Sequence, residues 1–230
     1  MAQDEMNEGR ERALAAMFVV SNVISSRTLD WRQLGWISGR RATTRSNFPA
    51  NFEYVDLRGL SLADLERALD EERGAYALLE AAGFDQASID EVDRQRAASP
   101  FIPILDFGVV SAVVAVSALG CVPVTSCRGP TLGLRPHQQP APMIVFYARR
   151  THVPTLLETV ERADCQIVNN GAKVEIYAND VRKMRRFAVM MREAIVNLSE
   201  TRSANDRSNN DFADTLITGA KDPKAIRTPE

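Results

Sequence analysis

Chemistry in this 230-residue chain would centre on Cys127, which ends a short β-branched run and is followed by Arg128 and Gly129. A cysteine nucleophile needs a thiol pKa that is lowered by a cation, a base or backbone amides. Arg128 is a cation beside the thiol, and His137 lies in the proline-rich loop that follows. We therefore take Cys127 and His137 as candidate catalytic residues, and Ser126, Arg128 and Gly129 as candidate ligand-binding residues.

The plainer interpretation of Cys127 is a buried cysteine that packs as a small hydrophobic residue at the end of a strand. The three cysteines of the chain lack C-x-x-C spacing, and the sequence has neither a phosphate-binding loop nor a dinucleotide-binding fingerprint. An extended strand would hold Cys121 about 20 Å from Cys127, too far to share one ion. We therefore expect no metal and no cofactor. The alternative is a metal site formed by Cys127, His137 and Cys165, if the three side chains meet at one end of a sheet.

The elements that must position these residues follow one another after residue 100. Asp106 can cap the first helix, Gly120 suits the left-handed position after its end, and Asn170-Gly171 favours a tight hairpin. In chain order we expect a helix over 108–119, strands over 121–127 and 143–148, a helix over 154–164, strands over 166–168 and 173–177, and a last helix over 181–198.

This αββαββα order predicts an α+β fold whose two-layer domain has a mostly antiparallel four-stranded sheet with helices on one face. Helices are also expected over 8–24, from Ser61 with a capping box to Asp64, and over about 86–97. Pro100 marks a boundary, because the residue before a proline is pushed out of helical geometry. The expected domains are a helical region at 1–99 with an Arg/aromatic loop at 25–55, an α+β domain at 100–199 and a mostly disordered tail at 200–230.

Two cationic stretches interrupt a chain whose net charge is only -2. In 25–55, arginines are interleaved with aromatic residues that could stack bases, while the last helix carries a basic face. Equally, the aromatic residues could cover the core while the arginines reach into water. The candidate nucleic-acid contacts are Arg40, Arg41, Arg182, Lys183, Arg185 and Arg186.

The last predicted helix also has a heptad seam, which is typical of helix association. Its positions are Val181, Met184, Ala188, Met191, Ile195 and Leu198. Together with the apolar face of 8–24, this seam predicts a protein partner or self-association.

One uncharged run of 21 residues, from Phe107 to Cys127, is long enough to span a membrane. Gly120 and Pro123 break it, and a buried helix followed by a buried strand has the same hydropathy. We therefore expect no membrane contact. The acidic N-terminus does not resemble a secretory signal, and an odd number of cysteines suits a reducing compartment, so we expect a cytoplasmic protein.

The piece Val124-Thr125-Ser126-Cys127-Arg128-Gly129, with the apolar strand over 143–148, resembles the Ser-Ser-Cys-x-Gly loop of wybutosine-synthesis tRNA methyltransferases of the third-step type. It is also similar to the Ser-Cys-x-Gly-His turn of small bacterial proteins. In this chain Thr125 stands in place of the first serine, and Pro130 follows the glycine. The first resemblance implies a role linked to nucleic acid or to S-adenosylmethionine.

These features favour an intracellular binding or assembly subunit of a multi-protein system, not an enzyme, with a ligand-contacting loop at 126–137. Two alternatives stay open. One is a cysteine-dependent enzyme or small-ligand sensor centred on Cys127, and the other is a nucleic-acid-binding accessory protein.

Overall fold

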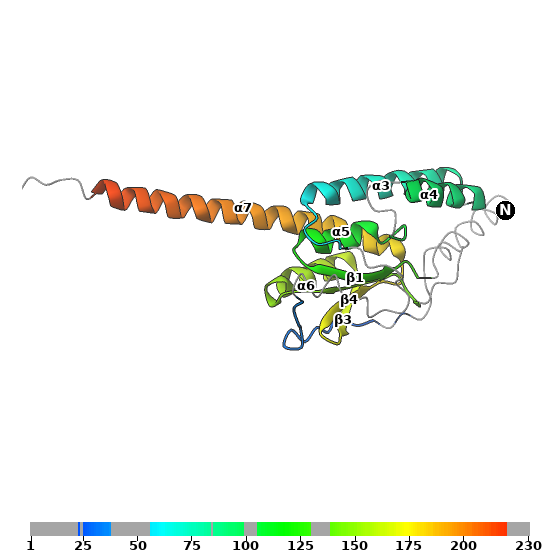
Figure 1. Cartoon of the computed structure of the whole chain (residues 1–230), viewed down its shortest axis with the longest axis horizontal. Helices are drawn as coiled ribbons and strands as arrows, with labels where there is room; N and C mark the ends of the chain where they lie inside the picture. The colour runs from blue at the N-terminus through cyan, green and yellow to red at the C-terminus, as the bar shows by residue number, and fades with distance from the viewer. Residues whose placement is uncertain are drawn as a thin grey trace, which may run out of the picture. The chain divides into compact units, whose positions relative to one another are not determined.

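The computed structural model describes residue 23 and residues 25–37, 56–83, 85–98, 105–129 and 139–219 (Figure 1). The predicted helix over 8–24 lies almost entirely outside these residues. The helices are α3 (Leu62–Ala81), α4 (Gln86–Ala98), α5 (Val110–Ala118), the short 3-10 helix η1 (Arg150–His152), α6 (Val153–Ala163) and α7 (Val181–Gly219). The strands are β1 (Val122–Cys127), β2 (Met143–Tyr147), β3 (Gln166–Asn170) and β4 (Lys173–Tyr177).

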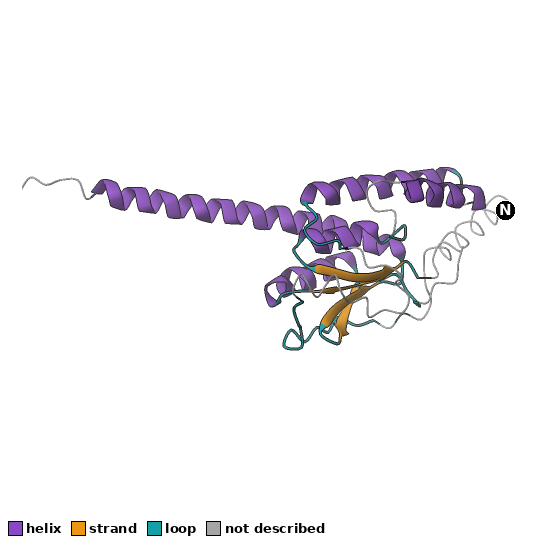
Figure 2. Ribbon diagram, viewed as in Figure 1, coloured by secondary structure: helices purple, strands orange, loops and turns teal. Residues whose placement is uncertain are grey.

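The four strands form one open sheet in the order β1-β2-β4-β3, and every neighbouring pair is antiparallel. Helix α5 packs against β1 and β2, and α6 packs against β3 (Figure 2). Along β4 only Val174 and Ile176 are fully buried, as the two-residue period of a strand with one covered face requires. The predicted α+β fold, its αββαββα order and its two layers are confirmed.

Neither edge of the sheet is a regular strand with an open row of backbone groups. The edge strand β1 contains Pro123, which cannot donate to a partner strand, and its register shifts between Pro123 and Thr125. At the other edge, Arg27 forms a parallel bridge with Ile167 of β3. Ile167 N donates to Ser26 O at 2.9 Å, so the edge of β3 is paired rather than open.

The uncharged run from Phe107 to Cys127 forms the buried helix α5 and the edge strand β1, whose last four residues are half-buried. Every residue from Val110 to Ser117 is buried, and Gly120 joins the two elements with a φ of 94°. The prediction of a buried helix followed by a strand is confirmed. In the described part of the chain, no helix is both long and apolar enough to cross a membrane.

The start of α5 is held by a carboxylate from another helix. Glu72 of α3 is buried, and its Oε1 accepts hydrogen bonds from Gly108 N and Val110 N, at 3.2 and 3.1 Å. Its Oε2 accepts from the Ser111 hydroxyl. The helix is preceded by Val109, whose side chain cannot cap it, so the capping role predicted for Asp106 is wrong. A carboxylate 36 residues away in sequence satisfies the free amides instead.

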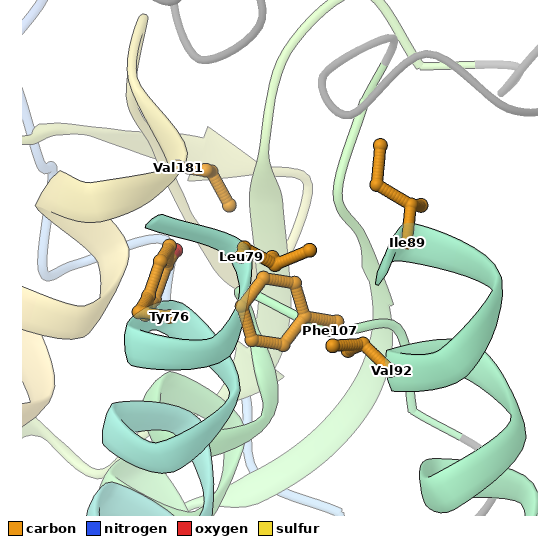
Figure 3. Packing of buried hydrophobic residues seen from close by; sticks show 6 residues of the cluster. All are labelled: Tyr76, Leu79, Ile89, Val92, Phe107 and Val181. Carbon is orange, nitrogen blue, oxygen red and sulfur yellow. The ribbon is translucent and has the colours of Figure 1, made fainter. Parts of the chain in front are cut away.

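The boundary predicted near Pro100 does not separate two cores. Side chains of α3 and α4 share one cluster with the segment before α5 and the first residue of α7 (Figure 3). Its members are Tyr76, Leu79, Ile89, Val92, Phe107 and Val181. The apolar faces of α3 and α4 need a partner to exclude water, and they find it across the predicted boundary. Residues up to Ala194 therefore form one compact unit, and 195–230 form another.

Helix α7 contributes most of its predicted seam to the core. Val181, Met184, Ala188 and Met191 are fully buried in the first unit, so they are not free to bind a partner. The seam pattern arises because one face of the helix lies on a core.

Helix α7 also continues beyond Leu198 to Gly219, where the composition predicts a disordered tail. Neither glycine nor proline occurs between 199 and 218. The hydroxyls of Ser199 and Thr201 donate to backbone carbonyls of the preceding turn, a bond that polar side chains can form inside a helix. The rest of the predicted tail, 220–230, lies outside the described residues.

We expect Glu72→Ala to lower the free energy of unfolding by about 3 kcal/mol or more, because it leaves three buried donors without an acceptor. Urea unfolding followed by circular dichroism measures the change. Glu71→Ala removes the exposed neighbouring carboxylate and should cost less than about 0.5 kcal/mol. Equal effects of the two variants would contradict the role given to Glu72.

Candidate functional site

The Cys127 thiol lies in a closed turn at the end of β1. Gly129 N donates to Cys127 Sγ at 3.3 Å, and Gly129 has a φ of 67°. A side chain at Gly129 would collide with the backbone of Ala141, because an added Cβ would lie 2.6 Å from its carbonyl carbon. Partial burial raises the pKa of the Cys127 thiol despite the hydrogen bond from Gly129. This arrangement favours the neutral thiol over a nucleophilic thiolate.

The other predicted ligand-binding residues take part in the same packing. Arg128 is 5% exposed, and its guanidinium lies 3.6 Å from Asp93 of α4. Its backbone N donates to Asp106 Oδ2 at 3.2 Å. Ser126 is half-buried and lies opposite Ile144 in the sheet. The charge of Arg128 thus anchors the turn to α4.

Of the three residues of the alternative metal site, the structure describes Cys127 and Cys165. Residues 127, 143, 177 and 166 form one row across the sheet, so Cys165, just before β3, lies at the same end of the sheet as Cys127. Three strand spacings separate them, about 14 Å. His137 lies outside the described residues. Within the ranges that are described, no group of three or more histidine, cysteine or acidic side chains could hold a metal ion.

A cysteine–histidine pair that was not predicted lies at the opposite end of β1. Cys121 Sγ is 3.3 Å from His152 Nδ1, just before α6. Burial raises the pKa of the Cys121 thiol far above its usual range. Burial thus favours the neutral thiol, which lies within hydrogen-bonding distance of the imidazole. The two residues are 31 positions apart, so no short-range spacing in the sequence indicated this pair.

Two of the basic residues predicted to contact nucleic acid are engaged in ion pairs on α7. Arg182 binds Asp180, and Lys183 Nζ lies 2.6 Å from Asp164. Arg185 is half-buried, Arg186 is exposed, and Arg40 and Arg41 lie outside the described residues. The carboxylates of Asp180, just before α7, and Asp164, at the end of α6, therefore weaken this part of α7 as a phosphate-binding face.

A different cationic and aromatic surface lies near the β3–β4 hairpin. Residues 25–37 run along β3, held by hydrogen bonds from Asp30 N to Asn169 Oδ1 at 2.7 Å and from Gly35 N to Ala172 O at 2.9 Å. These bonds fix the backbone on both sides of Trp31 and just before Trp36. A segment without helical or strand periodicity is thus ordered by an existing sheet edge.

Three guanidinium groups lie over the two indole rings of this segment. The Arg149 guanidinium is 4.5 Å from the Trp36 ring centroid, and that of Arg150 is 5.0 Å from the Trp31 centroid. Arg32 lies 5.3 Å from the Trp31 centroid. We call Trp31, Arg32, Trp36, Arg149 and Arg150 the tryptophan surface.

The tryptophan surface is open to solvent. Trp31 is 44% exposed and Trp36 is 45% exposed, unusual values for large apolar side chains. Within the described part of the chain, none of its three arginines forms an ion pair with a carboxylate. Nearby, Lys173 Nζ lies 5.9 Å from the Tyr147 ring centroid at the adjoining ends of β4 and β2. The surface therefore combines two exposed indoles, each with a guanidinium over its ring, with positive charge that no carboxylate of the described residues pairs.

The sequence contained part of this signal. The Arg/aromatic segment was a candidate for base stacking, and it includes Trp31, Arg32 and Trp36. Arg149 and Arg150 were missed, because they follow the apolar strand β2 more than a hundred residues later. Two arginines directly after an apolar strand were the available clue.

The comparisons with known proteins add no family. The chain matches no protein-family model, no curated protein and no solved structure. The resemblance of residues 124–129 to a loop of tRNA methyltransferases stays an expectation from the sequence.

We expect iodoacetamide to modify Cys127 more slowly than a free thiol near neutral pH, and before Cys121 and Cys165. Burial raises the pKa of all three thiols, that of Cys165 to about 12, and Cys127 is the least buried. Peptide mass spectrometry across a pH series measures the rates, with the urea-unfolded chain as the control. A Cys127 rate that levels off below about pH 8 would instead support a nucleophile.

Proposed function

We propose that this protein is a cytoplasmic, non-catalytic binding protein that binds nucleic acid through the tryptophan surface. One observation carries the proposal: two exposed indoles lie beside arginines that no carboxylate neutralises in the described part of the chain. Arginine offers planar, permanently charged donors to phosphate, and aromatic rings offer stacking surfaces to bases. The combination suits a polyanion that carries rings.

Local charge, and not net charge, supports this partner. The chain as a whole is slightly acidic, with a net charge of -2, so attraction of a polyanion depends on one region. Arg32, Arg149 and Arg150 supply three positive charges, and Asp30 is a carboxylate on the same segment. Asp30 already accepts hydrogen bonds from Arg32 N and Gln33 Nε2. The balance at the surface remains positive.

A non-catalytic role is supported by the state of the thiols. Cys121, Cys127 and Cys165 form no disulfide with one another, as suits a reducing compartment, and burial raises the pKa of each thiol. Arg128, next to Cys127, is buried and contacts Asp93, and Cys121 is buried beside His152. These features suit packing more than bond-breaking chemistry.

Replacing Arg149 and Arg150 together by glutamine should weaken binding to a single-stranded oligonucleotide about tenfold or more, because two charge-assisted contacts are lost. Fluorescence anisotropy with a labelled oligonucleotide of about 20 nucleotides measures the affinity at several salt concentrations. The slope of log affinity against log salt should fall by about 1.4, which is two phosphate contacts.

The matched control is the double variant Arg73→Gln with Arg94→Gln, which removes the same charge from exposed positions on α3 and α4. It should leave affinity within about twofold, since its charges are already paired. Absence of oligonucleotide binding by the unmodified protein, or binding that does not change with salt, would refute the proposed function.

Self-association is a second candidate, favoured by the end of the heptad seam. Leu198 is 39% exposed on α7, past the four seam residues that are buried in the core. A long helix with an exposed leucine on its seam suits pairing with a second copy. The protein partner predicted for 8–24 remains a prediction.

Leu198→Glu should shift the protein toward a monomer, because it places a charge in the paired seam. Light scattering over a concentration series measures the mass. Leu157→Glu, at an equally exposed leucine on α6 that is 37% exposed, should leave the mass unchanged. A monomeric unmodified protein, or equal effects of both variants, would remove this candidate.

A further inference from the structure

We infer that the nucleic acid bound by this protein is single-stranded, and that its unpaired bases stack on the indoles of Trp31 and Trp36. This inference rests on the proposed function and specifies its ligand. In a duplex the flat faces of the bases are covered by their neighbours. Only an unpaired strand can offer base faces to an exposed indole.

The two indoles are held in position before any ligand arrives. Gln33 N donates to Asp30 O at 3.1 Å and closes the turn that contains Trp31. Gly35 N donates to Ala172 O, which places Trp36 beside the β3–β4 hairpin. Because the backbone is already ordered, binding has little conformational entropy to lose there. A base can therefore stack at this surface without first ordering the backbone that carries the two rings.

Each arginine of this surface can serve the same ligand in two ways. A guanidinium that lies near an indole keeps its planar face toward the ring and its N–H donors at its rim. Those donors can reach a phosphate while a base stacks on the exposed indole area or on the guanidinium plane. Arg149 and Arg150 are adjacent in sequence, and each lies beside a different indole. The surface thus offers two neighbouring subsites, each with one indole for a base and one arginine for a phosphate.

The chain provides its own spectroscopic probe, because Trp31 and Trp36 are its only two tryptophans. Stacking of a base on either ring should quench the intrinsic fluorescence. The test titrates the full chain with three ligands of about 20 nucleotides: oligo-dT, an abasic strand with the same phosphates, and a duplex. Anisotropy of labelled strands gives the affinities in the same buffer.

We expect oligo-dT to quench the fluorescence and to bind at least about fivefold more tightly than the abasic strand, the minimum for one stacked base. The duplex should quench little and bind more weakly than oligo-dT. This order is diagnostic, because a purely electrostatic surface prefers the duplex for its higher charge density.

Variants assign the effect to the rings. Trp31→Ala and Trp36→Ala should each lower affinity for oligo-dT about fivefold or more, while leaving affinity for the abasic strand unchanged. Trp31→Phe and Trp36→Phe keep an aromatic face and should retain most of the affinity. Leu157→Ala, which removes an exposed apolar side chain from α6, should have no effect. Circular dichroism checks that each variant is folded.

The outcomes separate the inference from the proposed function. Equal binding of oligo-dT and the abasic strand, or preference for the duplex, would overturn base stacking and leave phosphate binding intact. Failure of all three ligands to bind would overturn both. Binding of poly-glutamate as tight as that of oligo-dT would show that the surface recognises negative charge alone. That result would overturn both base stacking and the proposed function.

Discussion

The buried carboxylate of Glu72 is the interaction on which the arrangement of the helices depends. A polar side chain in the interior is tolerated only when hydrogen bonds replace its water. Gly108 N, Val110 N and the Ser111 hydroxyl supply those bonds, and they are groups that would otherwise lack partners at the start of α5. One side chain therefore satisfies two needs at once. It joins α3 to the apolar helix that packs against β1 and β2.

Arginine side chains lie at both ends of the sheet, but they are buried and paired at one end and lie at an exposed surface at the other. At the Cys127 end, Arg128 is buried and its charge faces Asp93, so the turn is closed by its own contacts. At the other end, Arg149 and Arg150 lie beside exposed indoles, with no carboxylate partner among the described residues. Buried charges need partners inside the protein, whereas exposed charges can keep water until a ligand replaces it. For this reason we place the candidate binding site at the tryptophan surface and not at the Cys127 turn.

Residues 25–37 connect the fold to the candidate site. Their backbone has no helix or strand of its own, yet it bonds to β3 and to the β3–β4 turn at several points. The edge of β3 is thereby covered, and two large aromatic rings are placed next to arginines from the end of β2. The same hydrogen bonds thus pair the backbone at the edge of β3 and position the two indoles of the candidate binding surface.

Local patterns in the sequence determined the elements themselves. The αββαββα order, the Ser61 capping box, the Asn170-Gly171 hairpin and the left-handed Gly120 all depend on residues within a few positions of one another, and all are present. Tertiary structure alone decided which elements share a core, why the α7 seam is buried, and which cations meet the two tryptophans. Those outcomes depend on contacts between residues tens to more than a hundred positions apart. No short-range period encodes such contacts, because they form only when the apolar faces of separate elements are buried together.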